Sequence, residues 1–328
     1  MKPLHKEMLL AAFLGLVLPW LLVNTVLSME EKRETEPASE GRIPEETETA
    51  PESEPLLIGF RDGDGNVTEM EMDVYLTGVL LAELPASFER EAKMAQAVAA
   101  RTFALKAAVT GGKHGDGSVC GSSYCCQAYI TPEDYRAAGG TEAAIAQARQ
   151  AALDTSGLVL CYEGGLIEAT YFSCSGGSTE DAVAVWGADY PYLRAVDSPG
   201  EEAAPRYSDT VTFTPEEFEA ALGTNLNGSP EDWFGFTTYT SGGGVNTMRI
   251  GSKDYKGTDL RRLLGLRSTA FTVTADGGGV TITTRGFGHR VGMSQYGADA
   301  MAASGKGFEE ILNYYYGGTE LTLWQPEN

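Results

Sequence analysis

The sequence predicts an α+β fold, with one compact region of mixed helices and antiparallel hairpins behind an N-terminal transmembrane helix. Period-two alternation on either side of glycine-containing turns predicts the hairpins, and a long stretch with apolar residues at helical spacing predicts the main helix. An apolar run at 8–27 has about the length that crosses a bilayer. We therefore divide the 328 residues into a cytoplasmic tip with anchor (1–28), an acidic spacer (29–55) and a folded domain (56–328).

The charges around the apolar run predict its orientation. Lys2 and Lys6 precede it and glutamates from Glu30 onward follow it, which favours a cytoplasmic N-terminus and an extracytoplasmic domain. Lys32 and Arg33 reduce this asymmetry. A cleaved signal peptide is the alternative, but the run is long for a signal sequence and no small-x-small site follows it. The expected location is the cell membrane, spanned once.

The composition excludes one class of partner. The formal net charge is −22 and the isoelectric point is about 4.5, whereas nucleic-acid binding requires a basic surface, so nucleic acid is not expected as a partner. Glutamates are dense between Glu30 and Glu54, and almost no apolar residue lies among them. Such a segment cannot bury a core, and we interpret 29–55 as a disordered spacer.

The folded domain opens with a hairpin and a short helix. Leu57–Phe60 and Val67–Met72 have the pattern of strands on either side of a turn at 61–66. Asp73 is the expected cap of the helix, which should end at Glu83 because Pro85 disfavours helical geometry at the residue before it.

Glu83 is the candidate acid of the domain. It stands at the negative end of that helix among apolar residues, and both surroundings disfavour the charged carboxylate. A carboxyl group that stays protonated near neutral pH can act as a general acid. The alternative is a solvated glutamate at an ordinary helix end.

A second helix is expected from a cap at Ser87 to about Val109. Its apolar stripe consists of Met94, Val98 and Leu105. Arg101 falls within this stripe, so its guanidinium needs an acceptor, for which Glu83 is a candidate. The alternative is an arginine that extends its charged end into water.

One histidine and three cysteines then follow within a short segment: His114, Cys120, Cys125 and Cys126. They are enough to close a tetrahedral zinc shell, and a site with four protein ligands has no open position and is structural. A disulfide is the alternative in an extracytoplasmic domain. A bridge between the adjacent Cys125 and Cys126 would be strained, so a disulfide would use Cys120 and leave one thiol free. A metal accounts for all four residues.

The middle of the chain predicts a helix and two strands. The composition from Pro132 to about Ala152 is helical, and Leu158–Tyr162 and Leu166–Phe172 are expected strands. A loop of small hydroxyls and glycines at 173–179 follows, where backbone can approach a ligand closely. Trp186 and the aromatic run at 190–193 suit either stacking on sugar rings or a place in the core.

The C-terminal part predicts further helices and a hairpin. A capping box at Thr214 with proline at the first helical position predicts a helix to Leu222. A glycine-rich region, a helix near 258–264 and a hairpin of strands 270–274 and 280–284 are expected next. In the following segment, 286–297, polar side chains stand between glycines at a strand-to-helix turn. This pattern favours the lip of a site over an ordinary connection.

Three chemistries can be compared with these residues. A serine hydrolase is disfavoured because Gly292–Gly297 has the wrong spacing for a nucleophile elbow. A cysteine peptidase would pair Cys174 with His289. Glycosidic cleavage by a single acid fits better. Hydrolysis requires two carboxylates, but a transglycosylase that closes the sugar's own C6 hydroxyl onto the anomeric carbon requires one, which protonates the leaving oxygen and then removes the hydroxyl proton.

Several stretches, in order from about Leu57 to Leu323, resemble the stage II sporulation protein D family of membrane-anchored lytic transglycosylases. They are Glu83–Glu89 with Ala95–Thr102, Cys120–Tyr129, Ser175–Gly177 with Trp186 and Tyr190–Leu193, Leu263–Phe271, and Gly288–Ala298 with Ile311–Tyr316.

The resemblance implies cleavage of denuded peptidoglycan glycan strands between N-acetylmuramic acid and N-acetylglucosamine, with 1,6-anhydro products, during forespore engulfment in sporulation. It maps the catalytic acid onto Glu83 and supports structural zinc in the His114–Cys126 cluster. It also implies an amidase and endopeptidase and the membrane proteins of the engulfment machinery as partners. The residues expected to contact substrate or hold the acid are Arg101, Tyr171, Ser173, Ser175, Gly176, Gly177, His289, Met293, Ser294, Gln295 and Tyr296.

Two points remain open within this resemblance. Arg290 replaces a glycine of the family pattern, which leaves the width of the cleft at that lip undetermined. The family also includes amidase enhancers, so a non-catalytic, wall-binding enhancer of an N-acetylmuramoyl-L-alanine amidase is the alternative function.

Overall fold

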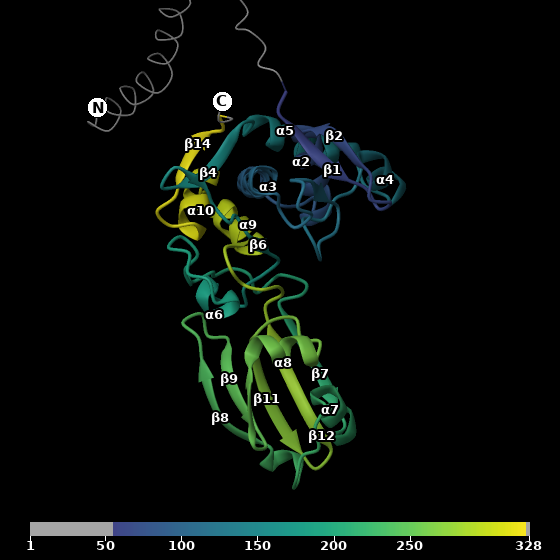
Figure 1. Cartoon of the computed structure of the whole chain (residues 1–328), viewed down its shortest axis with the longest axis vertical. Helices are drawn as coiled ribbons and strands as arrows, with labels where there is room; N and C mark the ends of the chain where they lie inside the picture. Colours follow the sequence, from purple (N-terminus) through teal and green to yellow (C-terminus); the bar gives the residue numbers. More distant parts are fainter. Residues whose placement is uncertain (1–54, 326–328) are drawn as a thin grey trace, which may run out of the picture. The chain divides into compact units, whose positions relative to one another are not determined.

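The structure, a computed structural model, describes residues 55–325 and is drawn in Figure 1. The predicted anchor (1–28) and spacer (29–55) lie outside these residues, apart from Pro55. Among the helices of 55–325, none has both the length and the apolar character that crossing a bilayer requires.

The α-helices of the described chain range from five residues in α6 to 21 in α3. The α-helices are α2 (Met72–Glu83), α3 (Arg90–Thr110), α4 (Pro132–Ala137), α5 (Glu142–Asp154), α6 (Ala182–Trp186), α7 (Pro215–Leu222), α8 (Gly257–Leu263), α9 (Gln295–Ala303) and α10 (Phe308–Tyr315), and a 3-10 turn covers Pro230–Asp232.

The strands pair into several small sheets. They are β1 (Leu57–Arg61), β2 (Val67–Glu71), β3 (Val119–Cys120), β4 (Leu158–Tyr162), β5 (Gly165–Leu166), β6 (Tyr171–Phe172), β7 (Ser208–Phe213), β8 (Phe234–Tyr239), β9 (Val245–Ile250), β10 (Lys253–Lys256), β11 (Ala270–Asp276), β12 (Gly279–Arg285), β13 (Met293–Ser294) and β14 (Glu320–Leu323). The strand orders are β2-β1-β3, β10-β9-β8, β11-β12-β7, β13-β6 and β14-β4-β5. The structure is therefore a mixed α+β domain.

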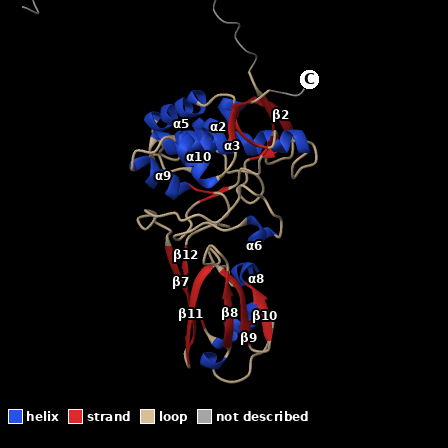
Figure 2. Cartoon of the chain, turned by 90° about the vertical axis from the view of Figure 1, so that its left-hand side faces the viewer, coloured by secondary structure: helices blue, strands red, loops and turns tan. Residues whose placement is uncertain are grey.

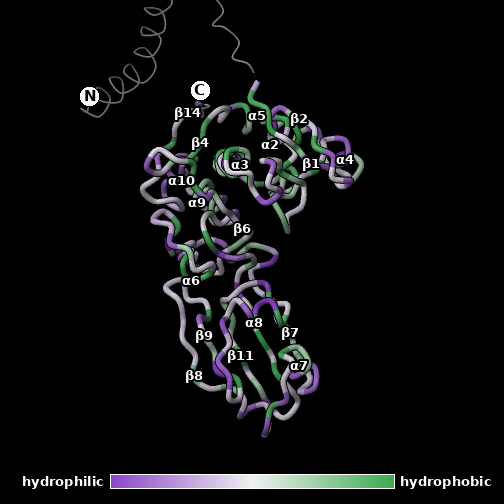
Figure 3. The backbone as a smooth tube through the Cα atoms, in the orientation of Figure 1, coloured by the Kyte–Doolittle hydropathy of each residue, from purple (hydrophilic) through white to green (hydrophobic). Residues whose placement is uncertain are grey.

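Two separate clusters of buried apolar side chains form the core. The first lies mainly among α2, α3, α5, β4, α9 and α10, and the second among α7, α8 and strands β9 to β12. Figure 2 shows the helices of the first cluster grouped together, apart from the long strands of the second. In Figure 3, α2 and β4 are drawn largely in the hydrophobic colour, as expected for elements that cross the first cluster.

The end of α2 agrees with the prediction, but its beginning does not. The helix stops at Glu83, and Leu84 is extended before Pro85. The predicted cap at Asp73 is wrong, because Glu71 occupies the cap position and Asp73 lies in the first turn. There the Asp73 carboxylate accepts a hydrogen bond from Ser156 at 2.7 Å and forms an ion pair with α3.

Helix α3 crosses the first core cluster. Its predicted stripe of Met94, Val98 and Leu105 is buried. The helix begins at Arg90 rather than after a Ser87 cap, because the chain first makes a turn in which the Phe88 N–H donates to the Pro85 carbonyl at 3.1 Å.

Five other predictions about elements can be compared with the structure. The hairpins β1–β2 and β11–β12 and the capped helix α7 are confirmed. The single helix expected from Pro132 to Ala152 is two helices, since the chain turns at Gly139, where φ is +90°. The strand expected at 166–172 is divided, because β5 pairs with β4 while β6 pairs with β13.

Candidate active site

Glu83 lies half-buried where α2 ends, and two groups hold its carboxylate. The Ala128 N–H donates to Oε1 at 2.8 Å, and the Gln295 amide donates to Oε2 at 3.2 Å. These donors come from distant parts of the chain, the segment after the cysteine cluster and the first residue of α9. The tertiary fold therefore fixes the orientation of this carboxylate.

Burial raises the pKa of Glu83 above its ordinary value of 4.5, and the hydrogen bonds from Ala128 and Gln295 act in the opposite direction. The net shift favours the protonated carboxyl. The two donors also stabilise the carboxylate once the proton has left. This combination suits a group that gives up a proton and later recovers one.

Tyr171 stands beside this acid. Its ring comes from β6, which pairs in parallel with β13 directly before Gln295. Burial, with a further contribution from the charge of Glu83, raises the pKa of Tyr171 well above its ordinary range. Its hydroxyl is buried and makes no close hydrogen bond among the described residues, although the Gln127 side chain lies near enough to act on its pKa. A buried hydroxyl without a close partner retains the capacity to bond to a ligand.

Arg101 does not reach this site. Its side chain is fully buried, with an ion pair to Asp73 at 3.0 Å and a hydrogen bond to the Ala152 carbonyl at 2.9 Å. The proposal that Glu83 accepts from Arg101 is therefore wrong, and contact of Arg101 with substrate stays a prediction. Asp73 and Glu83 stand about 15 Å apart along α2, since each residue adds about 1.5 Å, and α3 brings Arg101 to the Asp73 end.

A second acid, Glu201, holds the predicted glycine loop through hydrogen bonds. Glu201 is buried, and its Oε2 accepts hydrogen bonds from the N–H and hydroxyl of Ser175 at 2.7 and 2.8 Å and from the Gly176 N–H at 3.1 Å. The Gly177 N–H donates to the Ser175 hydroxyl at 3.0 Å. The donors at Ser175 and Gly176 are thus used inside the fold, and only Gly177 of these three is exposed.

The other predicted residues near α9 have structural contacts. Ser173 is half-buried, and its carbonyl accepts from the Tyr296 N–H at 3.0 Å. The Ser294 hydroxyl caps α9 by accepting from Gly297. Met293 is fully buried beneath these residues, and the Tyr296 ring packs edge-on against Phe88 at 4.9 Å. Substrate contact by these four residues stays a prediction.

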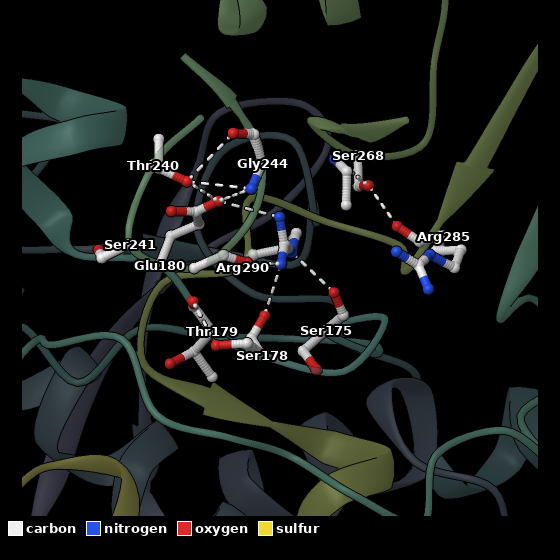
Figure 4. A network of polar contacts seen from close by, with 12 residues as sticks. Ser175, Ser178, Thr179, Glu180, Thr240, Ser241, Gly244, Ser268, Arg285 and Arg290 are labelled. Atoms are coloured by element: carbon white, nitrogen blue, oxygen red, sulfur yellow. Dashed lines mark hydrogen bonds and ion pairs between the residues drawn. The ribbon is translucent and has the colours of Figure 1, made fainter. Parts of the chain in front are cut away.

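Arg290 forms a buried ion pair with Glu180, at 2.9 Å, in the network drawn in Figure 4. Its guanidinium also donates to the carbonyls of Ser175, Ser178 and Gly242, at 2.7, 2.7 and 2.6 Å. The backbone at Arg290 is left-handed, with φ of 66°, which is the conformation glycine adopts without strain. The arginine side chain is directed into this network, where it joins the loop after β6 to the loop before β9.

His289 lies against two aromatic rings. Its ring centre is 5.3 Å from that of Trp186 and 5.6 Å from that of Phe172. Its Nδ1 accepts a hydrogen bond from the Val291 N–H at 3.1 Å, which assigns the proton to Nε2. Burial, together with the positive charge of Arg261, lowers the pKa of His289 to about 4, so this imidazole is neutral at physiological pH.

The cysteine peptidase alternative lacks the required geometry. The Cys174 thiol contacts the Arg206 carbonyl at 3.9 Å, and the described contacts of His289 do not include it. Burial raises the pKa of Cys174 to about 11, which opposes formation of the thiolate nucleophile.

The histidine and three cysteines do come together. The ligand atoms of His114, Cys120, Cys125 and Cys126 all lie within 4.8 Å of one another, and the three thiols are free. The His114 Nε2 is 3.7 and 3.6 Å from the sulfurs of Cys125 and Cys126, which are 3.9 Å apart. A tetrahedral zinc shell requires about 3.6 Å between nitrogen and sulfur and about 3.8 Å between sulfurs. The cluster can therefore hold a metal ion with little rearrangement.

Three residues that the sequence analysis did not select also shape these sites: Ala128, Glu180 and Glu201. Ala128 acts through its backbone, which no side-chain pattern reveals. The two glutamates accept hydrogen bonds from loop residues. Only their burial distinguishes them from the many exposed acids of this chain. The signal in the sequence that could have pointed to Ala128 is its position next to the cysteine cluster.

Comparisons with known proteins identify the family of this chain. Residues 61–162 match the family model described as SpoIID, stage II sporulation protein. The chain is 39% identical over 292 residues to stage II sporulation protein D of Bacillus subtilis, which covers 88% of this chain and 83% of the relative. It is also 39% identical over 279 residues to stage II sporulation protein D of Bacillus amyloliquefaciens, covering 84% of this chain and 80% of the relative.

A more distant relative carries a different name. The amidase enhancer of Bacillus subtilis is 29% identical over 307 residues, covering 76% of this chain and 40% of that protein. The two stage II sporulation proteins are matched over most of their length and at higher identity. The chain therefore belongs to the stage II sporulation protein D family.

Proposed function

We propose that this protein is a lytic transglycosylase that cleaves the bond between N-acetylmuramic acid and N-acetylglucosamine in denuded peptidoglycan strands during sporulation. The observation that carries the proposal is the Glu83 carboxyl, whose pKa burial raises and whose two oxygens accept hydrogen bonds from Ala128 and Gln295. A single acid is sufficient for this reaction because the nucleophile is a hydroxyl of the sugar itself.

The proposed reaction uses Glu83 twice. The protonated carboxyl gives its proton to the glycosidic oxygen, and the bond from the anomeric carbon to that oxygen breaks. The C6 hydroxyl then attacks the anomeric carbon, and the Glu83 carboxylate takes the hydroxyl proton. The products are a 1,6-anhydromuramyl end and a free 4-hydroxyl, and Glu83 returns to its protonated form. Gln295 and Ala128 hold the carboxylate between the two steps.

The cysteine cluster is proposed to hold zinc in a structural role. Four protein ligands leave no open position for water or substrate, so the ion supplies no chemistry to the reaction. Its effect is to fix the loop that ends in Ala128, and His114 and the three cysteines provide the shell.

We also propose the setting in which the reaction occurs. The apolar run at 8–27 anchors the protein in the cell membrane by a single pass, with the catalytic domain outside the cytoplasm. An amidase and endopeptidase that removes stem peptides, and membrane proteins of the engulfment machinery, are the proposed protein partners.

The test is mass spectrometry of products from denuded glycan strands incubated with the full chain in detergent. We expect 1,6-anhydro products from the wild type and a loss of about 100-fold or more in rate for Glu83→Gln. Glu69→Gln is the matched control, since Glu69 is exposed on β2. Undiminished release of anhydro products by Glu83→Gln would refute the proposal.

The amidase enhancer among the relatives supports a second candidate function, a non-catalytic enhancer of a cell-wall amidase. The two functions differ in what Glu83 does. If the wild type releases no anhydro sugar but stimulates an N-acetylmuramoyl-L-alanine amidase, and Glu83→Gln stimulates it equally, the enhancer function is correct.

A further inference from the structure

Arg261, on α8, combines partial burial with the lack of a polar partner, whereas Arg149, Arg206 and Arg285, which also have no hydrogen bond or ion pair among residues 55–325, are exposed. It is half-buried, yet its guanidinium has no hydrogen bond and no ion pair within the described chain. The two buried arginines, Arg101 and Arg290, each have an acidic partner and carbonyl acceptors. Burial lowers the pKa of Arg261, with no neighbouring acid to offset it. An arginine that loses water without gaining an acceptor is suited to receive an anion from a ligand.

The turn after α8 packs against the segment that leads into His289. The Leu266 N–H donates to the Arg261 carbonyl at 2.9 Å, and the next residue, Arg267, accepts at its carbonyl from the Gly288 N–H at 3.1 Å. Gly288 directly precedes His289, and the positive charge of Arg261 acts on that imidazole. The two hydrogen bonds therefore link the backbone that follows Arg261 to the residue directly before His289.

An exposed aromatic ring completes this surface. Trp186 is 43% exposed although it ends a helix packed near the core, and its ring lies 5.3 Å from that of His289. A tryptophan with an open side suits stacking on a sugar ring. The neutral imidazole packs against the indole, and its own ring nitrogens face the backbone of Val291 and Tyr171. Arg261 adds one positive charge at this place.

On the proposed substrate, one group can meet that charge. A muramic acid stripped of its peptide carries a free lactyl carboxylate, whereas a muramic acid with a stem peptide carries an uncharged amide at the same position. N-acetylglucosamine has no lactyl group. We propose that Arg261 binds the free lactyl carboxylate of a muramic acid that stacks on Trp186, and so selects denuded strands. This inference rests on the proposed function for the identity of the glycan.

The test measures binding rather than cleavage. The full chain in detergent carries Glu83→Gln to prevent turnover, and titration calorimetry uses three tetrasaccharides: denuded glycan with free lactyl carboxylates, the same glycan with lactyl methylamides, and chitotetraose. The parent should bind the free acid tenfold or more tightly than the other two, since a hydrogen bond to a charged partner is worth about that factor.

The informative variant is Arg261→Gln. It should weaken binding of the free acid by tenfold or more and leave the methylamide and chitotetraose unchanged. Arg261→Lys should recover part of the preference. The matched control is Arg262→Gln on the same helix, whose side chain is 72% exposed and should leave all three affinities unchanged. Thermal melting of each variant verifies folding.

Two results would overturn the inference. One is an equal loss for all three ligands with Arg261→Gln, which would indicate a structural arginine. The other is no loss for the free acid. The proposed function is tested separately, by the release of anhydro sugar from the wild type. The preference for the free acid can therefore be found in a protein that does not cleave the glycan, and it can be missing in a protein that does.

Discussion

The backbone N–H of Ala128 donates a 2.8 Å hydrogen bond to the Glu83 carboxylate, and Ala128 is the second residue after Cys126. A donor for the candidate acid is thus carried on the loop that the histidine and cysteines define. The Tyr75 hydroxyl fixes the same loop by donating to Gln127 at 2.8 Å. The proposed metal site and the proposed catalytic acid are therefore parts of one structural unit, and the first prediction follows from this.

Metal removal should destabilise the protein before it changes the reaction itself. Chelation or Cys126→Ser should lower the melting temperature, because the loop of His114 to Cys126 has no regular structure beyond two residues of β3 to maintain it. Elemental analysis should give one zinc per chain. Cys161→Ser is the control, since Cys161 lies on β4 outside the cluster. Full thermal stability combined with abolished turnover would contradict a structural metal.

The pH dependence should report the raised pKa of Glu83. A general acid must be protonated, so the rate should fall as pH rises through that pKa. The folded state binds this proton more tightly than the unfolded chain, whose value is about 4.5. The stability contributed by the neutral form is therefore lost as pH rises from about 4.5 through the folded pKa.

Glu83→Gln should remove this dependence. In urea denaturation we expect equal stability of variant and wild type at pH 4, and a variant at least as stable as the wild type at pH 8, because glutamine keeps an acceptor for Ala128 without a buried charge. A variant that is less stable only at high pH would mean that the carboxylate is stabilised in the fold.

Tyr171→Phe should separate stability from activity. The Tyr171 hydroxyl is buried without a close hydrogen bond among the described residues, so its removal should leave the free energy of unfolding unchanged or raise it by about 1 kcal/mol. If the hydroxyl serves the substrate, the rate should fall by tenfold or more. The control is Tyr75→Phe, which loses the bond to Gln127 and should cost about 1 kcal/mol.

The ion pair of Arg101 with Asp73 should respond asymmetrically to substitution. Asp73→Ala leaves a fully buried guanidinium without its acid and should cost about 3–5 kcal/mol in urea denaturation. Arg101→Met removes the buried charge and should cost less, since the Asp73 side chain is 25% exposed and keeps its bond to Ser156. Arg90→Met, at an exposed pair, should cost no more than about 1 kcal/mol. Equal costs for the two core substitutions would contradict this account.

Substitution of Arg290 should show how much its left-handed backbone conformation costs in the free energy of unfolding. Arg290→Ala and Arg290→Gly both leave Glu180 buried without its cation and should be strongly destabilising. Glycine tolerates the φ of 66° whereas alanine does not, so Arg290→Gly should be the more stable variant by about 1 kcal/mol in the free energy of unfolding. Equal stabilities would mean that this backbone relaxes when the arginine is lost.

Much of the fold could be predicted from local signals. Pro85 ended α2 at Glu83, the capping box at Thr214 began α7, and alternation located the hairpin β11–β12. The sheet of β8, β9 and β10 was missed because its region is rich in glycine, which weakens strand patterns, and its strands are held by pairing with one another.

The sequence by itself determined the candidate acid, the four ligand residues and the family resemblance, since each depends on residue types at short spacing. Only the tertiary structure decided which groups hold them. Gln295 and Ala128 bind Glu83, Asp73 takes Arg101, and Glu201 occupies the donors of the glycine loop. These pairings join residues far apart in the chain. The packing of helices and short strands therefore determines which of many chemically equivalent acids accepts each hydrogen bond.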